Sequence, residues 1–138
     1  MTDKAFFDTN ILVYAFASQS VSGADARAKR AEELLSLGGI VSVQVLNEFA
    51  DVANHKLKFS WAAVETGLGA IVALCGPPIA LNAETHLHAV GLSKRYGFRI
   101  YDSLILAAAD KAGCTIVYTE DLQHGQAIGN VTVVNPFR

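Results

Sequence analysis

The 138-residue sequence is short of several features that mark particular protein classes. It has only two cysteines, Cys75 and Cys114, too few for a disulfide-built secreted domain, and both lie in apolar stretches where buried free thiols are expected. No apolar run reaches the roughly 18 residues needed to cross a bilayer, because glycine and proline interrupt the best candidate, residues 69–81. The first residues also lack the apolar region of a secretory signal. These absences predict a cytoplasmic protein without a membrane segment.

Charged residues are scarce as well. They make up 17% of the chain against 51% hydrophobic residues, a composition that excludes a disordered protein and can supply a substantial core. The length suits one domain, and no repeat, low-complexity tract or linker divides it. We therefore expect a single domain over residues 1–138.

Short apolar segments alternate with segments of helical periodicity. The expected strands are 4–7, 40–43, 79–81, 115–118 and 131–134. The expected helices are 11–17, 24–37, 44–56, 61–75, 82–96 and 102–112, with 18–23 as a polar connection. Spacing predicts an apolar face on two of the helices: Trp61, Val64, Leu68 and Ile71 on one, and Ala83, Leu87 and Val90 on the other. Such alternation is typical of an α/β protein, here a three-layer α/β/α sandwich with a short, mainly parallel central sheet.

Four acids from separate segments fall where such a sheet binds ligands, beyond the carboxyl ends of its strands. Asp8 follows the first strand and interrupts an otherwise apolar run, and Asp121 lies just after the strand ending at Tyr118. Glu48 lies in the first turns of the helix after 40–43, and its spacing from neighbouring valines turns it inward. Asp102 stands at the beginning of its helix.

Each acid has an ordinary explanation when it is taken alone. Asp8 and Asp102 could cap helices, Glu48 could be a solvated residue near a helix N-terminus, and Asp121 could belong to a turn. Together these explanations are weaker, because capping does not require an inward Glu. Carboxylates gathered at one point repel each other, and their pKa values rise unless a cation lies among them. Oxygen ligands suit Mg²⁺ or Mn²⁺ rather than zinc, so the pattern predicts a site for one or two such ions.

The net charge of −2 argues against a general nucleic-acid binder, which is usually basic. If metal ions neutralised four of the thirteen acids, nine would remain against eleven basic residues, and the balance would become +2. The charge total therefore does not exclude an RNA substrate.

The residues Asp8-Thr9-Asn10, Glu48, Asp102 and Thr119-Glu120-Asp121, in this order and setting, resemble those of the PIN-domain ribonucleases. The match is closest to the VapC-type toxins of type II toxin–antitoxin pairs and covers Phe6 to about Val134. The resemblance implies that Asp8, Glu48 and Asp102 hold the metal ions, with Asp121 as a more variable fourth acid and Glu120 as its alternative. It also implies supporting hydrogen bonds from Thr9, Asn10 and Thr119.

The resemblance further implies hydrolysis of RNA to 5′-phosphate and 3′-hydroxyl ends, an antitoxin partner and a homodimer. Two groups of basic residues, whose ordinary explanation is a solvated helix face, are also candidate contacts to RNA phosphates: Arg27, Lys29 and Arg30, and Lys94, Arg95 and Arg99. The RNA target, its cleavage sequence and the number of ions stay open.

Other functions fit the same chain less well. A housekeeping PIN nuclease in RNA maturation, or a PIN module that only binds, would carry the same acids. A receiver-like signalling domain also gathers acids and Mg²⁺ at strand ends, but it needs an acidic pair near the first strand, where this chain has one acid. A haloacid-dehalogenase-type phosphatase would need an Asp at position 10, where Asn10 stands.

Overall fold

The computed structural model describes residues 4–17 and 26–138, and its centre is a small sheet. The sheet has the strand order β1-β2-β4-β3, formed by β1 (Ala5–Phe7), β2 (Ile116–Tyr118), β4 (Val131–Val134) and β3 (Ala127–Ile128). β1, β2 and β4 are parallel, and β3 pairs antiparallel with β4. The sequence did not predict β3, whose two residues are too short a run to show the alternation of a strand.

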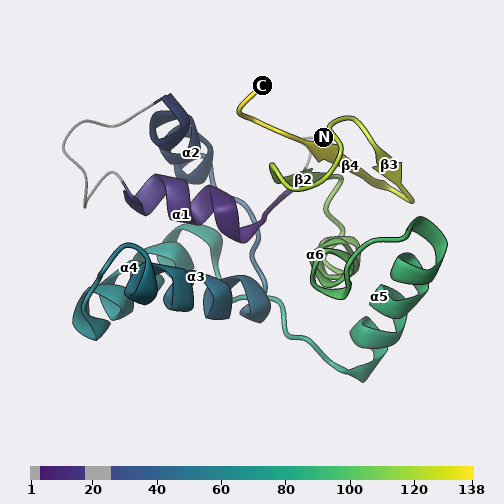
Figure 1. Cartoon of the computed structure of the whole chain (residues 1–138), viewed down its shortest axis with the longest axis horizontal. Coiled ribbons are helices and arrows are strands. Elements are labelled where there is room, and N and C mark those ends of the chain that lie inside the picture. Colours follow the sequence, from purple (N-terminus) through teal and green to yellow (C-terminus); the bar gives the residue numbers. More distant parts are fainter. Residues whose placement is uncertain (1–3, 18–25) are drawn as a thin grey trace.

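Six helices of the described residues cover the sheet in two groups (Figure 1). α1 (Thr9–Ala17) packs on α2 (Ala26–Ser36) and α3 (Val43–His55), and α3 packs on α4 (Trp61–Cys75). In the other group α5 (Ala83–Tyr96) packs on α6 (Ile100–Lys111), which contacts β2 and β4. This arrangement confirms the predicted α/β/α sandwich with its mainly parallel sheet. The expected connection 18–23 and the expected helix start at 24 lie outside the described residues.

Side-chain caps decide where three of the helices begin. Ser42, Ser60 and Asn82 each accept a hydrogen bond from the backbone N–H three residues later, at the starts of α3, α4 and α5. α5 ends at Gly97, whose φ of 78° is the left-handed conformation that glycine adopts without strain. The helix starts that the sequence predicted at 61 and at 82 agree with the observed starts of α4 and α5 to within one residue.

Two expected strands are wrong. Residues 40–43 and 79–81 form only single bridges, Ile40 with Phe6 and Ser42 with Ile79, and no continuous strand. The physical reason is the cap at Ser42, which begins α3 at Val43 and ends the extended segment early. Even so, Ile40 exchanges backbone hydrogen bonds of 2.9 Å with the β1 residues Ala5 and Phe7, which fixes the entry of α3 beside the sheet.

The apolar face that the sequence predicted is buried in part on α4 and exposed on α5. Val64 and Ile71 are buried, but Trp61 is 61% exposed, at the first turn of α4. Leu87 and Val90 are also exposed, because α5 turns its small residues, among them Ala89, toward α6. A helix that packs closely on an alanine-rich partner uses small side chains at the contact, and apolar periodicity alone does not show this.

The core lies between α1, α3 and the sheet, and one glycine shapes it. A Cβ on Gly39 would stand 2.5 Å from the ring of Phe7, so only glycine lets the chain cross β1 at this point. Cys114 is buried and Cys75 half-buried, and both are free thiols, as predicted. Within residues 4–17 and 26–138, none of the helices has the length and apolar character needed to cross a bilayer.

Candidate active site

Asp8 lies at the carboxyl end of β1, directly before α1, and only 5% of it is exposed. Its backbone N–H donates to the carbonyl of Tyr118 at the end of β2, which places the two strand ends side by side. The Thr9 backbone N–H donates to Oδ1 of Asp8, and the Thr119 hydroxyl donates to Oδ2, each over 2.7 Å. The carboxylate is therefore held on both oxygens at the edge of the sheet.

Thr119 and Asn10 connect Asp8 to Asp121. Thr119 is fully buried after β2, and its hydroxyl oxygen accepts from the Asp121 backbone N–H over 3.1 Å. The Asn10 amide donates to Oδ2 of Asp121 over 3.1 Å and lies 3.4 Å from the Thr119 hydroxyl. Asp121 itself is exposed, so this network turns an otherwise solvated carboxylate toward α1.

Glu48 reaches the same place from α3 and is half-buried. Its Oε2 accepts from the Thr9 hydroxyl over 2.8 Å, and its Oε1 accepts from the Gln44 amide over 2.8 Å. Thr9 therefore contacts two acids, Asp8 through its backbone and Glu48 through its side chain. Sequence reasoning placed Thr9 beside Asp8 and missed Gln44, since a glutamine in the first turn of a helix carries no particular signal.

Asp102 is the third residue of α6 and does not cap it. The cap position is Arg99, which makes no side-chain capping bond, so the capping explanation for Asp102 does not apply. Burial raises the pKa of Asp102, with further increases from the negative charges of Asp121 and Glu48, while Arg99 lowers it.

The same two charges act on Asp8, whose pKa is raised to about 7. Burial is the largest cause, the charges of Asp121 and Glu48 add to it, and hydrogen bonds from Thr119 and Thr9 act in the opposite direction. Asp8 after β1 and Asp102 in the first turn of α6 therefore both lie within electrostatic reach of Glu48 on α3 and of Asp121 after β2. Across the described ranges, no three such ligands are already arranged around a common point for a metal ion. Hydrogen bonds to Thr9, Gln44 and Asn10 hold Glu48 and Asp121 in this form of the site.

Glu120, the alternative fourth acid, has a different partner. Its Oε1 accepts from the Tyr14 hydroxyl over 2.8 Å, and that hydroxyl accepts from Arg27 over 3.2 Å. The Arg27 guanidinium also lies over the Tyr14 ring, 5.7 Å from its centre. Burial and the Glu120 carboxylate raise the pKa of Tyr14, so this hydroxyl remains a donor. Glu120 points toward α1 and α2, and Asp121 is the one that faces the other acids.

A groove of about 450 Å³ opens beside the acids, between α1, α3 and the segment after β2. It is lined by Thr9, Asn10, Val13, Tyr14, Glu48, Asp51, Val52, Lys56, Glu120 and Asp121. Glu48, Val52 and Lys56 follow one another at four-residue spacing along one face of α3. Lys56, which sequence reasoning did not single out, is the one basic residue among these lining residues.

The predicted RNA-contacting residues divide between two parts of the molecule. Arg27 donates a hydrogen bond to the groove residue Tyr14, and the charge of Arg99 lowers the pKa of Asp102. Arg95 instead lies over Tyr96 and lines a separate cavity of about 150 Å³ between α5, α6 and the β3–β4 turn. Lys29, Arg30 and Lys94 are exposed, and Arg30 lies 3.6 Å from Glu33 on its own helix.

Comparison with known proteins identifies the fold and the family. The model of the PIN domain matches residues 5–127. A chain of a toxin–antitoxin complex from Klebsiella pneumoniae superposes with a TM-score of 0.71 at 22% identity, covering 96% of this chain and 98% of that one. VapC20 of Mycobacterium tuberculosis, a toxin that cleaves the sarcin–ricin loop, superposes with a TM-score of 0.60 at 19% identity, covering 86% of this chain and 90% of its own.

No curated protein matches the chain. At these identities the two solved structures show a shared fold. The family match spans most of the chain, including β1, α3, α6 and the segment after β2, the elements that carry the four acids. The chain therefore belongs to the PIN domain family.

Proposed function

We propose that the protein is a metal-dependent endoribonuclease that acts as the toxin of a type II toxin–antitoxin pair. The observation that carries the proposal is the convergence of Asp8, Glu48, Asp102 and Asp121 from four separate segments, where the charges of Glu48 and Asp121 raise the pKa values of Asp8 and Asp102. A structure that gathers carboxylates in this way loses stability unless a cation compensates them, so the arrangement is explained by ion binding. Membership in the PIN family removes the support for a receiver-like domain or a dehalogenase-type phosphatase.

The donor set fits Mg²⁺ or Mn²⁺. All four side chains offer hard oxygen ligands, and none of the described residues that line the groove is a histidine or cysteine. Asp8, Glu48 and Asp102 would hold the ions, with Asp121 as the fourth acid in place of Glu120, whose carboxylate is bound to Tyr14. A bound ion would supply an attacking water of lowered pKa and neutralise charge on the phosphate. The proposed products, 5′-phosphate and 3′-hydroxyl ends, require that water attack phosphorus while the bond to the 3′ oxygen breaks and that oxygen takes up a proton.

The chain's own residues would orient that chemistry. Thr9 and Thr119 donate hydrogen bonds to the two oxygens of Asp8, and Asn10 donates to Asp121. These bonds would fix the orientation in which the carboxylates meet the ions. Lys56, together with Arg27 and Arg99, would contact RNA phosphates beside the acids and add affinity without sequence choice. Arg95 is a weaker candidate, because it lines a different cavity.

The toxin assignment rests on resemblance. One structural neighbour comes from a toxin–antitoxin complex, and the other is an RNA-cleaving toxin. By that analogy we propose a cognate antitoxin, a homodimer and a cytoplasmic site of action. The alternative within the family is a housekeeping PIN nuclease in RNA maturation. Growth arrest on expression, relieved by a small co-expressed partner, is expected only of the toxin.

The direct test is incubation of the purified protein with a mixed RNA pool in Mn²⁺ or in chelator, followed by mapping of the cut ends. We expect cuts that leave 5′-phosphates in Mn²⁺ and none in chelator. Asp102→Asn, which keeps the size of the side chain, should lower cleavage at least 100-fold while the thermal unfolding temperature stays within a few degrees. Cuts that persist in chelator would end the metal hypothesis, and full activity of Asp102→Asn would remove that residue from the site.

A further inference from the structure

Gln44 occupies an unexpected place for a polar residue in the first turn of a helix. It is the second residue of α3, yet it is only 7% exposed. A buried amide lowers stability unless its polar atoms find partners. The identity of those partners therefore indicates what the residue does.

The Gln44 amide joins two of the segments that carry acids. Its Nε2 donates to Oε1 of Glu48 over 2.8 Å and to the backbone carbonyl of Tyr101 over 3.1 Å. Tyr101 directly precedes Asp102 in the first turn of α6. One side chain thus connects the acid on α3 to the backbone that carries the acid on α6.

The orientation of this amide is fixed by chemistry. Both groups that it faces are acceptors, a carboxylate and a carbonyl, so the nitrogen must point toward them and the oxygen away. Its Oε1 is buried and has no hydrogen-bond partner among the described residues. A side chain present only to fill the core would be apolar and would avoid this unpaired oxygen.

The hydrogen bonds continue from Gln44 to Asp8. Glu48 accepts from Gln44 on one oxygen and from the Thr9 hydroxyl on the other, and the Thr9 backbone N–H donates to Asp8. Glu48 is thereby held at both oxygens by donors from two different helices. Without Gln44, the Glu48 side chain could rotate about its own bonds, and the start of α6 would lose its link to α3.

We propose that Gln44 is a positioning residue that holds Glu48 and the start of α6, and with it Asp102, in the relative placement that a divalent ion requires. This inference rests on the proposed metal site and adds a residue that acts on the ion only through the acids. Hydrogen-bond partners of metal ligands commonly change metal affinity by about 10- to 100-fold when they are removed.

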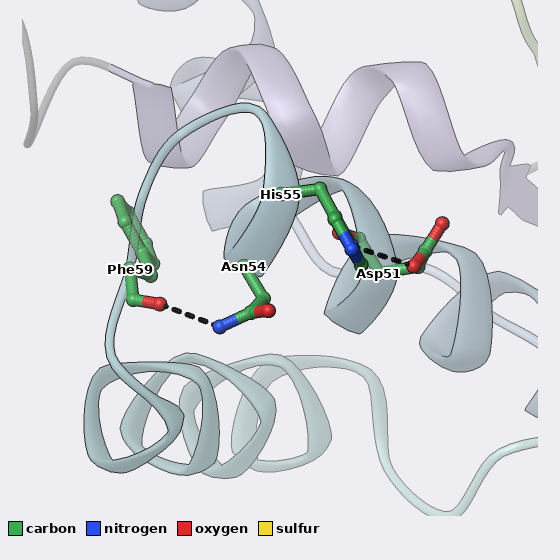
Figure 2. Close-up of polar contacts among 4 residues, drawn as sticks. All are labelled: Asp51, Asn54, His55 and Phe59. Atoms are coloured by element: carbon green, nitrogen blue, oxygen red, sulfur yellow. Dashed lines mark hydrogen bonds and ion pairs between the residues drawn. The ribbon is translucent and has the colours of Figure 1, made fainter.

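The test compares two variants of α3 in the full chain. Gln44→Met keeps the length of the side chain and removes both hydrogen bonds. The matched control is Asn54→Leu at the far end of the same helix, where the amide donates to the carbonyl of Phe59 over 3.0 Å (Figure 2). That bond ties the loop after α3 to the helix and does not involve the four acids.

Mn²⁺ affinity is measured by calorimetry without RNA, and thermal unfolding is measured in chelator. We expect Gln44→Met to bind Mn²⁺ about 10- to 100-fold more weakly than wild type, with an unchanged or higher unfolding temperature in chelator. Asn54→Leu should bind Mn²⁺ as wild type does and should unfold at a lower temperature. This opposite pair of effects would not arise if Gln44 were merely structural.

Three results would overturn the proposal. Equal Mn²⁺ affinity of wild type and Gln44→Met would remove Gln44 alone and leave the metal site standing. Equal losses of affinity in both variants would mean that any damage to α3 has this effect. No Mn²⁺ binding by wild type would overturn the proposed function together with this inference. If Gln44→Met fails to fold, Gln44→Asn takes its place, because its amide is too short to reach both acceptors. We expect Gln44→Asn to show the same loss of Mn²⁺ affinity. If Gln44→Asn also fails to fold, Gln44 has a structural role and the proposal is wrong.

Discussion

Replacing Asp8 with Asn should make the metal-free protein more stable and should change how its stability depends on pH. Asp8 is 5% exposed, and burial raises its pKa from 3.8 to about 7. Because the folded state binds the proton more tightly than the unfolded state, wild-type stability falls as pH rises from about 4 to about 7. Above about pH 7 the buried carboxylate is ionised and lowers the free energy of unfolding by a constant amount.

The size of the effect follows from the pKa difference. At 1.36 kcal/mol per pKa unit, the shift corresponds to about 4 kcal/mol of lost stability above pH 7, of which about 2.5 kcal/mol is lost between pH 5 and pH 8. The Asp8→Asn variant would have no such dependence. The Thr119 hydroxyl, which donates to Asp8 in wild type, would have to reorient toward the new amide, at a cost of about 1 kcal/mol. The net gain for Asp8→Asn at pH 8 is therefore about 3 kcal/mol.

The assay is urea unfolding of wild type and Asp8→Asn in chelator at pH 5 and pH 8. We expect the difference in unfolding free energy between the two proteins to grow by about 2.5 kcal/mol from the lower to the higher pH. The matched control is Asp110→Asn, which removes an exposed carboxylate on α6 and should shift stability by less than about 1 kcal/mol at either pH. A difference that stays constant between pH 5 and pH 8 would refute the buried, proton-binding state of Asp8.

Mn²⁺ should reverse the order of stability. An ion that binds only the folded state adds about 4.1 kcal/mol at a concentration 1,000 times its dissociation constant. This exceeds the advantage of about 3 kcal/mol that Asp8→Asn has at pH 8, and the gain requires the Asp8 carboxylate. Wild type should therefore gain stability on addition of Mn²⁺ at pH 8, and Asp8→Asn should not. Equal gains in both proteins would place the ion elsewhere.

Three further predictions concern the groove and the fold. Lys56→Gln should weaken RNA binding in chelator and lower the number of salt ions released on binding by about one. Lys58→Gln, an equal charge change outside the groove lining, should do neither. Filter-binding titrations at several salt concentrations check this, and equal effects of the two variants would show that Lys56 does not contact the RNA. Gly39→Ala should destabilise the protein by about 2 kcal/mol or more in urea unfolding, because its Cβ would meet an aromatic ring of β1 at 2.5 Å, and a wild-type midpoint would contradict that contact. Asn82→Ala should cost about 1 kcal/mol through loss of the cap bonds to Thr85, without changing cleavage, and a loss of activity at full stability would point to a different role.

Local features of the chain determined most of the helices. Apolar periodicity predicted α4 and α5 to within a residue, with Ser60 as the N-cap of α4, since a cap satisfies backbone N–H groups in its own first turn and needs no distant partner. The alternation of short apolar runs with helices predicted the layered fold, because parallel strands joined by helices form a sheet that is covered on both faces. The positions of the acids after strands predicted which residues would meet, because parallel strands end at a common edge.

Only the tertiary structure decided the features that depend on contacts between distant segments. The exposure of Leu87 follows from how α5 meets α6, and the loss of a strand at 40–43 follows from the competition between sheet pairing and the Ser42 cap. The roles of Gln44 and Lys56 also depend on distant segments. Gln44 donates to a backbone carbonyl of α6, and Lys56 lines a groove that α1 also lines. The sequence by itself indicated the acids through their positions after strands and near helix starts, and Asp8 most clearly because it interrupts an apolar run. It could not name the neutral side chains that hold them, because a glutamine becomes informative only when its partners are known.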